Sequence, residues 1–123
     1  MKNPAGWFEI YVQDMERAKK FYEAVFQVTL QRLEPPAELE MWSFPSDRTA
    51  YGAGGALVKM SGVSSGGNST LVYFSCDDCA VEQERVAGAG GKVQKPKFSI
   101  GQYGFISIVL DSEGNMIGLH SMR

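Results

Sequence analysis

The chain contains few histidine and cysteine residues, on which several classes of protein depend. Its 123 residues include one histidine and two cysteines, and the cysteines stand only three positions apart. A chain of this length can bury a core without covalent staples, so no disulfide framework is expected. Cys76 and Cys79 have the spacing of redox and zinc sites, but the two aspartates between them oppose thiolate formation and no further cysteine completes a zinc site. We expect both cysteines to be small apolar residues.

Long apolar runs and an excess of one charge are also missing. No window of about twenty residues is continuously apolar, and the opening residues 1–4 lack the apolar stretch of a secretory signal. The 12 basic and 14 acidic residues are interspersed and leave a formal charge of −2. This balance disfavours a nucleic-acid surface and a polybasic membrane anchor. We therefore expect a cytoplasmic protein that binds neither nucleic acid nor membranes.

The chain does contain a weak internal repeat. Residues 7–12 are rich in aromatic and β-branched side chains and predict a strand, after which Asp14 caps an amphipathic helix whose basic residues at 17, 19 and 20 face solvent. The same order returns after a shift of 64 residues, with a strand over 71–76, Asp78 as the cap and a helix that ends at Gly90. The shift also places Gly54 on Gly118.

Further strands are expected after each helix. They cover 29–33, 40–45 and 56–60 in the first half, and 92–94, 105–110 and 116–121 in the second. The prediction is an α+β fold of two tandem βαβββ modules in one domain over 1–123, with module one at about 5–62, a Ser/Gly-rich linker at about 63–69 and module two at about 70–123. We expect the buried surface to be divided between two helix-on-sheet layers.

Alternation along the first strand predicts which side chains share a face. The apolar set belongs under the helix and consists of Phe8, Ile10 and Val12. Trp7, Glu9 and Tyr11 then turn to the opposite face, where aromatic surface surrounds one carboxylate. The same parity turns Tyr73 to that face in the second half.

Residues 7–26, Trp-Phe-Glu-Ile-Tyr-Val-Gln-Asp-Met-Glu-Arg-Ala-Lys-Lys-Phe-Tyr-Glu-Ala-Val-Phe, closely resemble the opening of vicinal oxygen chelate proteins, the glyoxalase, bleomycin resistance protein and dioxygenase superfamily. The closing Leu-Asp-Ser-Glu-Gly-Asn-Met-Ile-Gly of 110–118 is similar to that family's Asp-Pro-Asp-Gly-Asn stretch, with Ser112 where proline is common. The resemblance spans nearly the whole chain. It implies an eight-stranded, cup-shaped sheet with the helices on its outer face, and a homodimer in which a second subunit completes or covers the cup.

The resemblance also implies four positions for metal ligands, one on each of four strands. In this chain those positions hold Trp7, Gly54 or Gly55, Leu71 and Gly118. None of these side chains supplies the oxygen or imidazole ligands that a divalent cation needs. We therefore expect no metal and no other cofactor. Whether the chain is an enzyme stays open, and the lack of metal ligands at these four positions favours a protein without enzymatic activity.

Six residues are candidates for binding a ligand in the cup: Trp7, Glu9, Tyr11, Trp42, Tyr73 and His120. Aromatic faces attract cations, and the bleomycin resistance branch is expected from the resemblance to bind flat, cationic compounds. The leading hypothesis is a metal-independent protein that binds a small aromatic or cationic molecule. Ordinary core packing is the alternative interpretation of the aromatic residues.

Glu9 and His120 are the candidate catalytic residues. Both are expected on the cup face, where a carboxylate and an imidazole could exchange a proton with a substrate. The alternative function is thus a glyoxalase-like lyase, isomerase or glutathione-linked transferase that uses this pair. A third reading is a protein-interaction module with a vestigial cup, in which both residues are polar groups at a rim or dimer seam.

Overall fold

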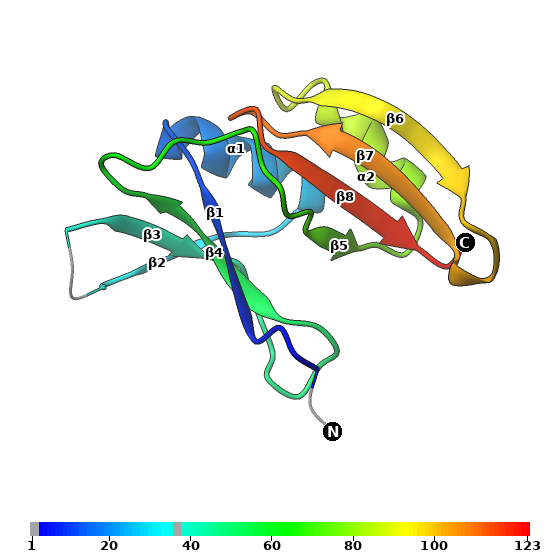
Figure 1. The fold of residues 1–123 in the computed structure, drawn as a ribbon, viewed down its shortest axis with the longest axis horizontal. Helices are drawn as coiled ribbons and strands as arrows, with labels where there is room; N and C mark the ends of the chain where they lie inside the picture. Colours follow the sequence, from blue (N-terminus) through cyan, green and yellow to red (C-terminus); the bar gives the residue numbers. More distant parts are fainter. Residues whose placement is uncertain (1–2, 36–37) are drawn as a thin grey trace.

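The computed structural model describes residues 3–35 and 38–123. Its elements follow the order of two βαβββ modules (Figure 1). The first contains β1 (Trp7–Tyr11), α1 (Met15–Phe26), β2 (Gln31–Leu33), β3 (Glu40–Ser43) and β4 (Gly54–Lys59). The second contains β5 (Tyr73–Ser75), α2 (Cys79–Val86), β6 (Lys92–Ser99), the 3-10 turn η1 (Gly101–Tyr103), β7 (Phe105–Leu110) and β8 (Met116–Ser121).

The eight strands form two mixed sheets of four. Their orders are β1-β4-β3-β2 and β5-β8-β7-β6, so each sheet contains the strands of one half of the chain. The first strand of each half pairs in parallel with the last strand of that half and is an edge strand. The predicted tandem βαβββ architecture of the α+β class is confirmed. The two sheets lie side by side, with faces free of helices that leave the cup open (Figure 1).

The helix starts follow from their caps. The Asp14 side chain accepts a hydrogen bond from the Arg17 backbone N–H, and the Asp78 side chain does the same for Ala80. Both satisfy backbone donors that a helix terminus otherwise leaves free. α1 ends where Gln27 adopts a left-handed conformation at φ 55°. The predicted caps are confirmed, and none of the helices within 3–35 and 38–123 is long and apolar enough to cross a membrane.

The third strand of the second half is longer than predicted. The sequence predicted a strand over 92–94 only, and Pro96, which cannot donate to a sheet ladder, follows two residues later. The strand instead continues to Ser99 along the edge of its sheet, and its pairing with β7 shifts register between Val93 and Lys95 and again between Lys95 and Phe98, the interval that contains the proline. An edge position and a bulge together accommodate the missing N–H.

The core is one continuous cluster that draws on both modules. Phe21 and Tyr22 of α1 are fully buried in the same cluster as Val109 and Leu119 of the second sheet. Tyr22 also contacts Phe74 of β5, with ring centroids 5.9 Å apart. The prediction of two separate helix-on-sheet layers is therefore wrong, because α1 packs against α2 as well as β4.

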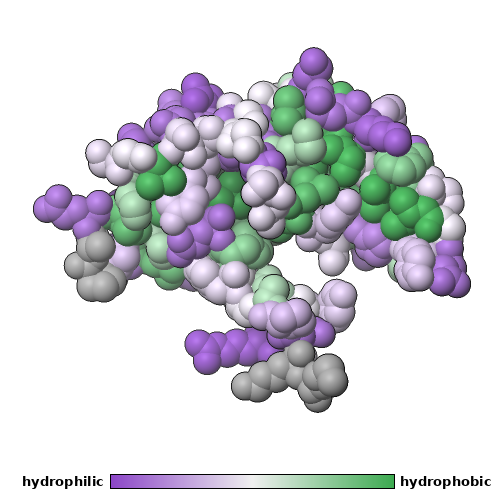
Figure 2. Space-filling view, in the orientation of Figure 1, coloured by the Kyte–Doolittle hydropathy of each residue, from purple (hydrophilic) through white to green (hydrophobic). Residues whose placement is uncertain are grey.

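Side-chain alternation in β1 agrees with the prediction. Ile10 is buried in the core and Phe8 packs against it, whereas Trp7 is 48% exposed and Glu9 is exposed. The helix-free face of the second sheet is largely apolar, because half-buried Ile106 and Ile108 lie there. Figure 2 shows apolar surface along this sheet on the side opposite the helices. The cup thus has an aromatic and acidic wall on β1 and an aliphatic wall on β7.

Candidate functional site

Three side chains on β1 form a hydrogen-bonded row. Their spacing of two residues turns them to the same face of the strand. The Trp7 indole Nε1–H donates to Glu9 Oε2 at 3.2 Å, and the Tyr11 hydroxyl donates to Glu9 Oε1 at 3.0 Å. The hydrogen bond to Glu9, with burial and the charge of Glu9, raises the pKa of Tyr11. The row, which we call the β1 row, holds one carboxylate in a fixed position between two aromatic rings.

A pocket of about 400 Å³ lies beside the β1 row. Glu9 and Tyr11 line it from β1, while Met116 and Ile117 line it from β8. The remaining wall comes from the segment that joins the two modules, including Asn68 and Thr70. The pocket therefore lies in the gap between the two sheets, and its volume is within the range of small-molecule sites.

Tyr73 occupies the place of one implied metal ligand. Tyr73 pairs with Gly118 across β5 and β8, and its half-exposed ring covers this glycine so closely that a Cβ there would overlap the ring. A ligand-bearing side chain at position 118 would therefore compete with the Tyr73 ring for the same space. Gly54 is less restricted, because a Cβ there would lie 3.2 Å from the Ser46 side chain and in ordinary contact with the Trp7 ring.

The described residues also lack a replacement metal site. Among residues 3–35 and 38–123, no three His, Cys, Asp or Glu side chains form a group able to hold a metal ion. The residues at the implied positions thus do not fit the metal of the resemblance. The absence of other cofactors stays a prediction.

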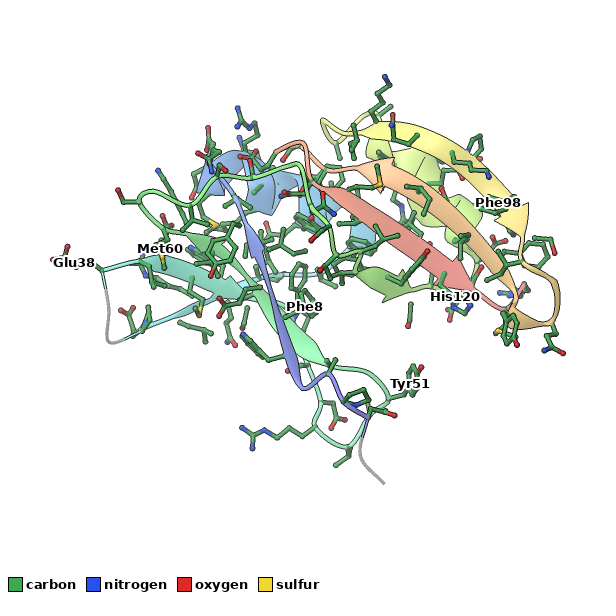
Figure 3. All side chains as sticks on the ribbon, in the orientation of Figure 1. Phe8, Glu38, Tyr51, Met60, Phe98 and His120 are labelled. Carbon is green, nitrogen blue, oxygen red and sulfur yellow. The ribbon has the colours of Figure 1, made fainter. Side chains whose placement is uncertain are left out.

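The structure does not bring Glu9 and His120 together. His120 Nε2 lies 2.7 Å from the backbone oxygen of Tyr103, which accepts a hydrogen bond when this nitrogen carries the proton. Both oxygens of Glu9 are used by its neighbours on β1. Figure 3 shows His120 at the far end of β8, well away from Phe8 on β1. An acid/base pair made by these two side chains is not formed.

Trp42 lies on the wrong face for the predicted site. It pairs with Leu57, which pairs with Ile10, and this row of side chains faces the helices. The Lys19 ammonium lies 3.3 Å from the centroid of the Trp42 ring, and the indole N–H donates to Glu40 at 3.0 Å. Trp42 therefore packs against α1, and Lys19, which we expected to be solvated, covers its ring.

The β7–β8 turn lies in the 110–118 stretch that resembles the family's closing motif, and its side chains make contacts that the resemblance did not indicate. Glu113 Oε1 accepts hydrogen bonds from the backbone N–H groups of Gln13 and Asp14, both at 2.9 Å, and its carboxylate pairs with Arg17. Burial raises the pKa of Glu113, but the bonds from Arg17, Asp14 and Gln13 outweigh it and lower the pKa to about 2. A side chain of module two thus caps the first helix of module one.

Two further side chains of the same turn reach module one. Asp111 accepts a 2.6 Å hydrogen bond from the buried Tyr22 hydroxyl, and Asn115 Nδ2 donates to the Tyr11 backbone oxygen at 2.9 Å. We call Asp111, Glu113 and Asn115 the module latch. Asn115 also lines the pocket beside the β1 row. The latch therefore fixes the end of β1 that carries the site.

Comparisons with known proteins agree with this architecture. Residues 5–119 match the family described as Glyoxalase/Bleomycin resistance protein/Dioxygenase superfamily. A protein of Mycobacterium tuberculosis named "Putative glyoxylase CFP32" is 28% identical over 117 residues, which are 93% of this chain and 44% of that protein. The chain thus spans less than half the length of this curated relative.

Two solved structures show the same fold. TnmS3, an antibiotic binding protein from Streptomyces sp. CB03234, has a TM-score of 0.68 at 24% identity, over 98% of this chain and 96% of that chain. Glyoxalase I from Zea mays has a TM-score of 0.73 at 20% identity, over 94% of this chain and 45% of that chain. The family match covers most of the sequence and both modules. The chain belongs to the Glyoxalase/Bleomycin resistance protein/Dioxygenase superfamily.

Proposed function

We propose that the protein binds a small, flat, cationic aromatic molecule at the β1 row, without a metal. The observation that carries this proposal is the position of Glu9, whose carboxylate is held between Trp7 and Tyr11 on an open sheet face. A fixed negative charge bordered by aromatic faces attracts a cationic ring both electrostatically and by stacking. Preorganisation by the two hydrogen bonds reduces the entropy lost on binding.

The pocket beside the row and one structural relative support the same proposal. The pocket has polar walls at Glu9 and Asn68 and an apolar wall at Met116, which suits a ligand with one charged and one apolar side. TnmS3, which shares the fold, is named as an antibiotic binding protein. The alternative enzyme that uses Glu9 and His120 has no contact between its two residues to support it. The homodimer and the cytoplasmic location stay predictions.

Tryptophan fluorescence tests the proposal. Trp42 lies on the helix face, so Trp42→Phe leaves Trp7 as the single tryptophan reporter next to the proposed ligand. We expect titration with proflavine, a flat aromatic cation, to quench Trp7 fluorescence saturably. Glu9→Gln in this background should weaken binding roughly tenfold, because it removes the charge and retains the side-chain size.

Glu34→Gln is the matched control. Glu34 is an exposed acid that follows β2 and pairs with Arg32, and replacing it with glutamine changes the net charge by the same amount as Glu9→Gln. We expect this variant to bind proflavine as the parent does. Quenching that never saturates would contradict binding at the β1 row. An equal loss of proflavine affinity in Glu9→Gln and Glu34→Gln would also contradict it.

A further inference from the structure

A second pocket lies on the other side of Phe8 from the β1 row. Its volume is about 330 Å³, and its walls come from the start of β4, from β5, from the end of α1 and from Glu82 of α2. Phe8 lines both pockets. Figure 3 shows Phe8 midway between the two sheets and Tyr51, which also lines this second pocket, on the loop beyond the ends of β1 and β4.

Six aromatic residues line this second pocket. Phe74 stacks on Phe26 with centroids 4.5 Å apart and meets Phe8 edge-on at 5.9 Å. Phe44, Tyr51 and Tyr73 complete the aromatic lining. Rings at these angles present both faces and edges, so they offer negative π surface to a bound cation.

The one acid in the lining is Glu82, and one of its two carboxylate oxygens has no close hydrogen-bond donor among the described residues. Its Oε1 atom is inaccessible to solvent and, among the described residues, receives no hydrogen bond. Glu82 follows the buried Cys79 by three residues and precedes the buried Val86 by four, so it belongs to the inward face of α2. A buried acceptor that is left unsatisfied destabilises the folded protein, and more strongly when it is charged.

The hydrogen-bonding neighbour of Glu82 is a weak one. The Cys76 thiol lies beside it, and burial first, then the charge of Glu82 and a hydrogen bond to its carboxylate, raise the pKa of Cys76 to about 12. That thiol is therefore neutral, a weak donor, and lies 3.6 Å from the Phe74 backbone oxygen. The two basic side chains nearest α2 have other partners: Arg85, within α2, donates to the Val25 backbone oxygen, and Lys97 pairs with Asp78.

We propose that this pocket binds a primary organic ammonium ion, whose N–H groups donate to Glu82 while its apolar body lies among the aromatic rings. A carboxylate with a free oxygen selects a cation that carries N–H donors over a quaternary ammonium, which has none. A charged donor also recovers the desolvation cost of the buried oxygen, which a neutral alcohol does less well. The pocket volume is near the lower end for ligand sites, which limits the ligand to a single ring or a short chain.

NMR titration of the isotope-labelled full chain tests this proposal. We expect 2-phenylethylammonium to shift the amide resonances of β5 and α2 saturably at millimolar concentration or below. The trimethylated analogue and neutral 2-phenylethanol should bind at least tenfold more weakly. Glu82→Gln should weaken binding of 2-phenylethylammonium at least tenfold, and Glu84→Gln, an exposed acid on the same helix, should change it less than twofold.

Stability supplies an independent measurement. Glu82→Met removes the unsatisfied carboxylate and is expected to raise the melting temperature of the unliganded protein while abolishing the titration. The proposal is overturned if the wild-type resonances do not shift at 10 mM ligand, or if the alcohol binds as tightly as the ammonium ion. It is also overturned if Glu9→Gln abolishes the shifts and Glu82→Gln does not. That last outcome would indicate that the cation binds at the β1 row. Failure of the Glu82 site and failure of the proposed function can therefore be distinguished.

Discussion

Gly118 and Gly91 are both positions where an added methyl group would overlap a neighbour, and the neighbours differ in their freedom to move. At Gly118 the obstacle is the half-exposed ring of Tyr73. At Gly91 the nearest obstacle is the backbone oxygen of Leu110, with Phe21 and Val86 of the core close behind. A side chain that borders solvent can change rotamer, whereas a strand backbone inside a packed core cannot.

Alanine substitutions should therefore have unequal effects. We expect Gly91→Ala to lower the free energy of unfolding by about 2–3 kcal/mol, because the core must shift to admit the methyl group. Gly118→Ala should cost about 1 kcal/mol, the price of one rotamer change at Tyr73. Urea unfolding of both variants measures the difference. Equal losses would mean that the Tyr73 ring is as fixed as the strand backbone.

At the scale of single residues the sequence predicted β1 well and β3 poorly. Phe8, Ile10 and Trp7 alternate so regularly that their faces follow from the period of a strand. In β3 every residue is half-buried, so its burial does not alternate and does not indicate which side chains face the core. The pairing of Trp42 with Leu57 decides the face, and pairing is a tertiary property that one sequence does not specify.

At the scale of elements, the turn between β7 and β8 acts on a helix far away in sequence. Glu113 gives α1 a cap from outside its own module, next to the local cap from Asp14. The carboxylate is stabilised as a charge there, since its pKa falls from 4.5 to about 2. A group whose folded pKa is depressed contributes stability above its unfolded pKa and loses it as the pH falls towards the folded value.

Stability should therefore depend on pH through this turn. The contribution of Glu113 is expected to be complete above about pH 4.5, to decline between about pH 4.5 and 2, and to reach about 3 kcal/mol at neutral pH. Comparing wild type with Glu113→Gln in urea isolates this group from other acids. We expect the free energy of unfolding of Glu113→Gln to be about 2–3 kcal/mol below that of wild type at pH 7, and this gap should close by pH 2. Glu16→Gln, on the exposed side of α1, should unfold with the same free energy as wild type at both pH values. A gap that is constant with pH would exclude the charge as its cause.

Elements also show which signals were available in the sequence. The spacing of Glu82 from Cys79 and Val86 places an acid on the buried face of α2, and helical periodicity alone could have revealed it. The turn 111–115 carries four side chains with oxygen acceptors, more than a tight turn requires. Their partners on α1 could not have been identified, because the angle at which the two modules pack does not follow from the pattern of either one.

At the scale of the whole molecule, the shared core and the module latch predict one cooperative unit. Trp7 and Trp42 both report on module one, and the amide resonances of β7 report on module two. We expect urea unfolding followed by tryptophan fluorescence and by the β7 resonances to give the same midpoint, as two-state behaviour requires. Glu113→Gln should lower both midpoints together. Separate midpoints would show that the modules are stable on their own.

The module latch has no counterpart at the other end of the molecule. A shift of 64 residues places the turn 111–115 on 47–51, where Asp47 accepts a hydrogen bond from the Thr49 N–H just as Asp111 does from the Glu113 N–H. Thr49 stands where Glu113 would be, and among the described residues no hydrogen bond joins this turn to α2. In a chain made of two identical copies, the turn of each module would be hydrogen-bonded to the helix of the other. Because the two turns differ, hydrogen bonds join the modules at the 111–115 turn, and none among the described residues joins them at the 47–51 turn. The second location is where Tyr51 and Glu82 border the same pocket.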